Sequence, residues 1–214
     1  MDLEKINTSG YDVIKNRIPM NTIQYLRDYT MVVKNRLHGK FGLEKPVGSP
    51  EYWQGADMAS KFPLSSYEEN RKLYEFYTSD FMYDIVVNYI PKPFLFNDQI
   101  VVKLPKEDFE FEPHRDNQHG PKPNDDKLFT INFMLVLDDI NQENGGFHVK
   151  DKVTNEWISL EPKTGDIVLI EGNTYHKSFK NQSDNPRRVY ICVYTNESIG
   201  KDFGNGFYYE RFIK

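Results

Sequence analysis

Two potential metal ligands lie two residues apart in the segment Phe111-Glu112-Pro113-His114-Arg115-Asp116. Positions i and i+2 of an extended segment project from the same face, so the imidazole of His114 and the carboxylate of Asp116 can reach one metal ion together. A His-x-Asp pair also arises by chance, and two ligands do not make a site. The pair therefore predicts half of a metal centre, which needs a third ligand from elsewhere in the chain.

The third candidate ligand is His176, which we place at the end of the apolar, strand-like run 167–170. Two histidines and one carboxylate on one side of a metal form the facial triad of non-haem Fe(II) oxygenases, which leaves positions open for a co-substrate and dioxygen. We therefore predict that His114, Asp116 and His176 bind Fe(II) and are the catalytic residues. His148 competes for this role, but it belongs to no ligand-spaced pair, and we favour a structural role for it.

Two arginines, Arg187 and Arg188, begin the last clear strand, and Arg187 lies eleven residues past His176. An arginine inside a β-sandwich is costly unless it meets an anion, and its planar fork suits a carboxylate bidentately. The alternative is a pair of cations that both face solvent. Alternation along a strand lets only one of the two point inward.

The run from Phe129 to Leu137 has uniformly apolar odd positions, whereas its even positions include Thr130 and Asn132. One face is expected to pack against helices, and the other can line a site with a few hydrogen-bonding groups. The alternative is that Thr130 and Asn132 face water. Before it, Phe111 is expected on the strand face opposite to His114, provided that Pro113 does not disturb the alternation.

Residues 11–14 are typical of a short strand, after which the helical patterns come first and the remaining strands follow. Asn21 predicts the start of a helix through about Leu37, and a long loop follows over 39–64, in which Trp53 either lines a pocket or packs under the loop. A second helix begins at Ser65 and breaks near Ser79-Asp80. The strands expected after it are 100–102, 109–112, 129–137, 147–149, 157–160, 167–170 and 189–194.

This order predicts a mainly β fold, an antiparallel double sheet with helices packed on one outer face. We expect one domain over 1–214, with helical support and a loop over 1–93, a jelly-roll core over 94–195 and an aromatic tail over 196–214. Asn144-Gly145-Gly146 offers a turn or a close backbone approach. His119 is interpreted as a loop residue or a substrate contact, and the run 203–209 has no assigned role.

The composition excludes several partners. The net charge is −5 and no basic run occurs, which disfavours nucleic acid and anionic membranes. The single cysteine, Cys192, permits no internal disulfide, and no apolar leader or membrane-spanning stretch is present. We expect a soluble, cytoplasmic monomer or homodimer that acts on a small molecule.

With His114-Arg115-Asp116, Asn144-Gly145, His176 and Arg187 in this order, the chain resembles the phytanoyl-CoA dioxygenase-like family of Fe(II)/2-oxoglutarate-dependent oxygenases. The resemblance runs from about residue 98 to 195, and more loosely to the amino-terminal segment that begins with residues 10–13. It implies a double-stranded β-helix, which is a jelly-roll fold. One departure is Met134, which stands where some members have a tryptophan.

The resemblance implies that the enzyme decarboxylates 2-oxoglutarate to succinate and CO2 while it oxidises a substrate with dioxygen. Arg187 would bind the C5 carboxylate of 2-oxoglutarate, and Thr130 and Asn132 are further candidate contacts. Because Asp116 is present, hydroxylation is favoured over halogenation. The competing hypotheses are a cupin-like isomerase or hydrolase without redox chemistry, and a non-catalytic jelly-roll module in which the three ligands do not converge.

Overall fold

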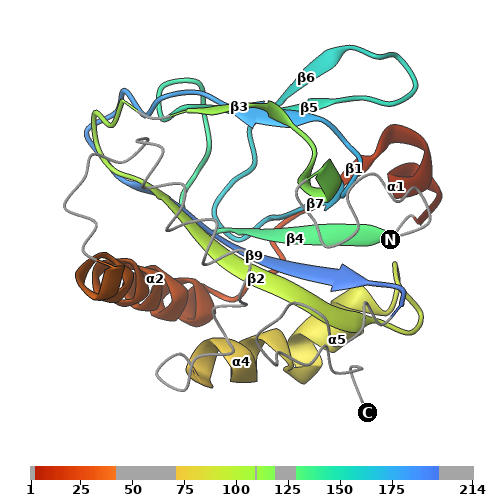
Figure 1. Cartoon of the computed structure of the whole chain (residues 1–214), viewed down its shortest axis with the longest axis horizontal. Coiled ribbons are helices and arrows are strands. Elements are labelled where there is room, and N and C mark those ends of the chain that lie inside the picture. The colour runs from red at the N-terminus through yellow and green to blue at the C-terminus, as the bar shows by residue number, and fades with distance from the viewer. Residues whose placement is uncertain (1–2, 42–70, 109, 119–128, 198–214) are drawn as a thin grey trace.

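The fold consists of two antiparallel sheets that face each other, with most helices on the outer side of the larger sheet (Figure 1). The structure is a computed structural model, which describes residues 3–41, 71–108, 110–118 and 129–197. Its helices in this part of the chain are α1 (Leu3–Ser9), α2 (Met20–Phe41), α4 (Arg71–Tyr77) and α5 (Asp80–Val86). A 3-10 turn, η3, covers Asp116–Gln118.

The larger sheet has the strand order β1-β7-β4-β9-β2, and the smaller sheet has the order β3-β8-β5-β6. Every pairing within them is antiparallel. The strands are β1 (Tyr11–Ile14), β2 (Phe94–Lys103), β3 (Phe111–His114), β4 (Thr130–Val136), β5 (Phe147–Lys150), β6 (Trp157–Leu160), β7 (Ile167–Glu171), β8 (His176–Ser178) and β9 (Arg187–Thr195). The predicted jelly-roll architecture with helices on one outer face is confirmed.

The central strand β4 divides the apolar interior into two clusters. Its odd positions, Ile131, Phe133 and Leu135, pack with residues of the helices, while Met134 and Val136 pack between the sheets with residues of β5, β7 and β9. This is the alternation expected from the sequence. Because Thr130 and Asn132 share the face of Met134, they point between the sheets, and both are buried.

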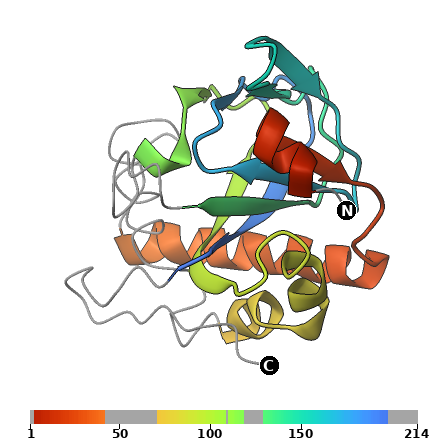
Figure 2. The ribbon, with the colours of Figure 1, turned by 90° about the vertical axis from the view of Figure 1, so that its right-hand side faces the viewer.

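Three helices cover the outer face of the larger sheet, and the turned view shows α2 lying across it with α4 and α5 beneath (Figure 2). The break predicted near Ser79 separates α4 from α5, because the Ser79 side chain caps the new helix by accepting a bond from the Met82 amide. Tyr77 at the end of α4 ties this layer to the sheet through a hydroxyl bond to the Val193 carbonyl.

The larger sheet also takes a strand from the amino-terminal region, at residues 11–14, where the sequence predicts a short strand. β1 pairs with β7, and the φ of +86° at Gly10 lets the chain turn from α1 into this strand. Most of the loop predicted for 39–64, with Trp53, lies outside the described residues, as do His119 and the run 203–209. In the part of the chain that is described, every helix is too short or too polar to cross a bilayer.

Candidate metal centre

The three predicted metal ligands meet at one end of the smaller sheet. His114 is the last residue of β3, and it pairs across the sheet with His176, the first residue of β8. The expectation that His176 ends the apolar run of β7 is wrong. A turn after Glu171 separates β7 from β8, and it carries the chain from the larger sheet to the smaller one.

The ligand atoms are close enough for one ion. Oδ1 of Asp116 lies 3.8 Å from Nε2 of His114 and 3.7 Å from Nε2 of His176. One atom from each of the three residues lies within 4.8 Å of the others. Bonds from a metal to imidazole nitrogen and carboxylate oxygen are about 2.0–2.2 Å, so two such bonds span both measured distances. The residues therefore fit a metal ion bound by two nitrogens and one oxygen.

The two histidines are oriented in the same way by the backbone. Nδ1 of His114 lies 2.6 Å from the carbonyl of Glu112, and Nδ1 of His176 lies 3.1 Å from the carbonyl of Thr174. A carbonyl only accepts, so each Nδ1 carries the proton and donates it, which leaves the Nε2 lone pair directed at the shared site. Such a second contact is characteristic of metal-binding histidines.

The segment that holds His114 and Asp116 departs from the simple extended geometry. β3 contains a register shift between Phe111 and His114, and Asp116 begins η3 rather than continuing the strand. The Phe111 ring therefore stacks on the His114 ring, with 5.9 Å between their centres. The expectation that Phe111 and His114 lie on opposite faces is wrong, because Pro113 has no N–H to continue the ladder and the strand bulges there.

Asn132 and Thr130 contact the ligand-bearing segment. The amide nitrogen of Asn132 donates to Oδ2 of Asp116, which leaves Oδ1 of the carboxylate toward the two histidines. Thr130 donates to Oδ1 of Asn117, at 2.8 Å. Oδ1 of Asn132 is buried without a hydrogen-bond partner. Asn132 thus orients Asp116, and a role for either residue as a co-substrate contact stays a prediction.

A close backbone approach fixes η3 against the turn before β8. The amide of Asn117 donates to the carbonyl of Gly172 at 3.0 Å, and the amide of Gly172 donates to Thr130 at 2.9 Å. A Cβ at position 172 would collide with Oγ1 of Thr130 and Oδ1 of Asn117. Asn117 and Gly172 were not singled out from the sequence. They bring Asp116 and His176 together, although the three segments are far apart in the chain.

The two arginines at the start of β9 point to opposite sides. Arg187 shares the face of Val189, which packs between the sheets, and its side chain is 3% exposed. Its Nη1 donates to the Gly146 carbonyl at 2.7 Å, while Nε is buried without a partner. Burial lowers the pKa of Arg187 to about 10. Arg188 faces the other way, where it meets Asp138. Only one of the two points inward, as alternation requires.

His148 lies on the opposite face of the smaller sheet from the ligands. Its neighbour Val149 pairs with His176, whereas His148 pairs with Lys177 and its ring contacts Phe179 edge-on. Burial and the charge of Lys177 lower the pKa of His148. A structural role for His148 therefore agrees with its position.

A second buried cation beside Arg187 was missed from the sequence. Lys103 ends β2, pairs with Arg187 and is fully buried. A signal was present, because Lys103 shares the strand face of Val101, which packs against the cluster between the sheets. The arrangement therefore combines three metal ligands with two buried cations, which suits a metal ion and an anionic co-substrate.

Comparison with protein families gives one match. The model for phytanoyl-CoA dioxygenase matches residues 148–189, a segment that contains His176 and Arg187. The resemblance predicted from the order and spacing of the motifs is confirmed by this match. No curated protein matches the chain.

Several solved structures share the fold at low sequence identity. The carbocyclase SnoK from nogalamycin biosynthesis is 16% identical with a TM-score of 0.69, over 97% of this chain and 92% of SnoK. The epimerase SnoN, solved with Fe3+, alpha ketoglutarate and nogalamycin RO, is 15% identical with a TM-score of 0.63, over 92% and 82%. The nickel complex of the non-heme monooxygenase ThoJ is 12% identical with a TM-score of 0.65, over 98% and 88%.

Proposed function

We propose that this protein is an Fe(II)- and 2-oxoglutarate-dependent dioxygenase that hydroxylates a small molecule. The observation that carries the proposal is the convergence of His114, Asp116 and His176, with both Nε2 atoms directed at the Asp116 carboxylate. The family match over the segment with His176 and Arg187 supports it. SnoN, of the same fold, was solved with Fe3+ and alpha ketoglutarate, which supports the same pair of cofactors here.

Each part of the site has a distinct task under this proposal. His114, Asp116 and His176 would hold Fe(II), which supplies the redox chemistry with 2-oxoglutarate and dioxygen when bound. Asn132 donates to Oδ2 of Asp116, which would leave Oδ1 free to bind the metal. Arg187 would bind the carboxylate of 2-oxoglutarate that lies remote from the metal. Its burial and its Nε, which has no hydrogen-bond partner, support this role. Asn132, His176 and Arg187 are buried, whereas His114 and Asp116 are partly exposed.

Hydroxylation is the finer part of the proposal. It is supported by Asp116, which occupies the carboxylate position, and by the monooxygenase activity named for ThoJ. SnoK is a carbocyclase and SnoN an epimerase, so the same fold also serves other oxidations. SnoN was solved with nogalamycin RO, which favours a small-molecule substrate. A single domain over 1–214, a cytoplasmic location and a monomeric or dimeric state stay predictions from the sequence.

The two competing hypotheses, a non-catalytic module and a cupin-like enzyme without redox chemistry, predict different arrangements of the site. A non-catalytic module predicts that the three ligands do not converge, which disagrees with their mutual distances. A cupin-like isomerase or hydrolase would use the same ligands, but it leaves the buried Arg187 without a role. Full activity with Zn(II) in the absence of oxygen would favour this second hypothesis.

The test separates metal binding from turnover. The protein is loaded anaerobically with Fe(II) and 2-oxoglutarate, oxygen is admitted together with candidate substrates, and succinate is measured. We expect succinate from the wild-type protein and none from Asp116→Ala, whose Fe(II) affinity should also fall. The proposal fails if the wild-type protein forms no succinate and Asp116→Ala binds Fe(II) as tightly as the wild type does.

A further inference from the structure

Two cations lie side by side between the sheets, on adjacent strands. Lys103 of β2 pairs directly with Arg187 of β9. Both side chains point inward with Val101 and Val189, and neither has appreciable exposure to solvent. Like charges at directly opposed positions of a sheet repel each other, and burial removes the water that would screen them. The pair is therefore unfavourable for the fold alone.

The pKa of Lys103 is lowered by burial and by the neighbouring charge. Burial and, to a smaller extent, the charge of Arg187 lower the pKa of Lys103 to about 6, while Glu107 and Glu110 act in the opposite direction. An anion placed against the ammonium would stabilise its charged form and raise the pKa again. A negatively charged ligand would therefore favour the charged form of Lys103.

The backbone of two turns holds both cations in place. Nζ of Lys103 donates to the carbonyl of Phe179, and Nη1 of Arg187 donates to that of Gly146. These two turns are joined, because the amide of Phe179 donates to the Gly145 carbonyl at 2.6 Å. Gly145 has a φ of +99°, and a Cβ there would collide with the Phe179 carbonyl. The Gly-Gly turn therefore positions Lys103 and Arg187 together.

The cation pair is linked to the metal ligands through aromatic rings. Nζ of Lys103 lies 5.4 Å from the centre of the Phe111 ring, which in turn stacks on His114. Phe147, which follows the Gly146 acceptor of Arg187, lies 5.9 Å from the His176 ring. The Phe111 ring thus lies between Lys103 and His114, and the Phe147 ring lies between the Arg187 acceptor and His176. The cations and the metal ligands therefore share two neighbouring rings.

We propose that Lys103 and Arg187 bind one carboxylate of the co-substrate together, so that the site selects a 2-oxo acid with two carboxylates over one with a single carboxylate. This inference rests on the proposed function and adds Lys103 as a specificity-determining residue. An ammonium has three donors, so the bond to the Phe179 carbonyl is compatible with a contact to a carboxylate. Arg187 supplies the planar fork and Lys103 a second positive charge.

The test compares two 2-oxo acids that differ only at the remote end. Binding of 2-oxoglutarate and of 2-oxopentanoate, which has a methyl group in place of the remote carboxylate, is measured by calorimetry on Mn(II)-loaded protein. In Lys103→Met the affinity for 2-oxoglutarate should fall about tenfold to a hundredfold, the change expected when a charged contact is lost. The affinity for 2-oxopentanoate should stay unchanged. The matched control is Lys180→Met, because Lys180 is exposed and pairs with Asp108.

A second measurement detects the proton that Lys103 takes up when 2-oxoglutarate binds. Titrations at pH 8 in buffers with different protonation enthalpies should detect proton uptake when 2-oxoglutarate binds, because the pKa of Lys103 rises from about 6 on binding. Lys103→Met should lose this uptake. A purely structural lysine would produce neither the uptake nor the change in selectivity. Thermal unfolding checks that the variant is folded, and Lys103→Gln replaces it if methionine is not tolerated.

The outcomes separate the two proposals. If the wild-type protein binds 2-oxoglutarate and Lys103→Met binds it equally well, or if the variant weakens both 2-oxo acids alike, the role of Lys103 is overturned and the proposed function stands. If the Mn(II)-loaded wild-type protein binds neither 2-oxo acid, the proposed function is overturned and the inference falls with it.

Discussion

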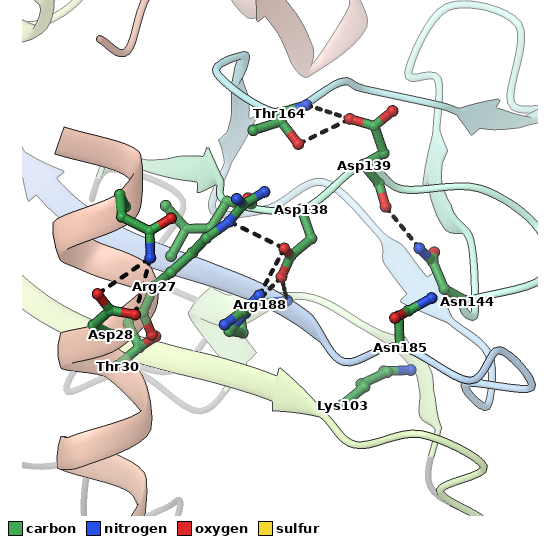
Figure 3. A network of polar contacts seen from close by, with 12 residues as sticks. Arg27, Asp28, Thr30, Lys103, Asp138, Asp139, Asn144, Thr164, Asn185 and Arg188 are labelled. Carbon is green, nitrogen blue, oxygen red and sulfur yellow. Dashed lines mark hydrogen bonds and ion pairs between the residues drawn. The ribbon is translucent and has the colours of Figure 1, made fainter. Parts of the chain in front are cut away.

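Arg187 and Arg188 are adjacent in the chain, yet they lie in two regions with opposite electrostatics. Arg188 donates from Nε and Nη2 to Asp138, at 2.7 and 2.9 Å, and its amide donates to the same carboxylate. Arg27 of α2 reaches Asp138 from the helix layer at 3.2 Å (Figure 3). Arg187, in contrast, meets the neutral Gly146 carbonyl and lies beside another cation, Lys103.

The two arginines differ in the group that balances their positive charge. In the Asp138 network the anion belongs to the protein, so the network joins α2, β9 and the turn after β4 and contributes to stability. Among the described residues no ion pair joins Arg187 to a carboxylate, and the charges of Glu107 and Glu110 act on the neighbouring Lys103; we infer that an anionic ligand balances the charge of Arg187. A buried arginine that meets a carboxylate of the protein therefore indicates a structural network in this fold, and we interpret Arg187, which meets a neutral carbonyl instead, as part of a ligand site.

The largest expected effect tests this comparison directly. Arg187→Met should weaken 2-oxoglutarate binding by at least a hundredfold, because the bidentate contact to the carboxylate is lost. Its stability should be maintained, since a buried charge is replaced by an apolar chain of similar length. The matched Arg188→Met should bind 2-oxoglutarate normally and unfold at lower temperature. Calorimetry and thermal unfolding measure both quantities, and equal effects of the two variants on binding would contradict the comparison.

Removal of the shared anion should destabilise the outer network. Asp138→Ala leaves Arg27 and Arg188 without their carboxylate, and both arginines are largely buried. We expect a loss of about 2–4 kcal/mol in the free energy of unfolding, as for other broken, largely buried pairs. The affinity for 2-oxoglutarate should not change. Urea unfolding provides the measurement, and a loss of less than about 0.5 kcal/mol would show that the network is dispensable.

A smaller effect is expected at the residue that orients Asp116. Asn132→Leu keeps the volume but removes the bond to Oδ2 of Asp116. Metal affinity should fall about tenfold, which is typical when the partner of a metal ligand is removed. Competition with a chelator measures it. The control is Asn144, whose side-chain amide donates a hydrogen bond to the backbone carbonyl of Asp139 at 2.6 Å. Asn144→Ala should leave metal affinity unchanged. Unchanged affinity in Asn132→Leu would show that Asp116 is held by other contacts.

The smallest effect concerns acid stability in the outer region. The backbone bond from Thr164 lowers the pKa of Asp139 below 3.8, with burial opposing it and Lys163 assisting. A lowered pKa adds stability above the unfolded value of 3.8, and this stability is lost as the pH falls through the folded pKa. Asp139→Asn should therefore be less stable than the wild type at pH 6, by under about 1 kcal/mol because Asp139 is half exposed, and the difference should vanish near pH 3. A difference that does not depend on pH would exclude this origin.

Much of the metal site followed from local sequence. The residues His114, Asp116 and His176 were identified by ligand type and order, and alternation correctly divided the faces of β4 and separated Arg187 from Arg188. These predictions succeeded because a strand has a period of two, whatever it packs against. The alternation failed at Phe111, where Pro113 and a register shift interrupt the ladder.

Lys103, Asn117 and Gly172 could not be assigned roles in the same way. Their importance comes from contacts between segments that are distant in the chain, such as Lys103 with Arg187 and Gly172 with Thr130. No local pattern records which two strands will be neighbours. The break between β7 and β8, which moves His176 into the other sheet, was missed for the same reason.

The sequence by itself determined the ligand types, the periodicity of the strands and the inward direction of one arginine, because these depend on side-chain chemistry and on the geometry of a single strand. Only the tertiary structure decided that His114 and His176 face each other across β3 and β8, and that Lys103 is buried against Arg187. The physical reason is that strand pairing sets distances between remote residues, and electrostatic effects depend on those distances and on the water that burial removes.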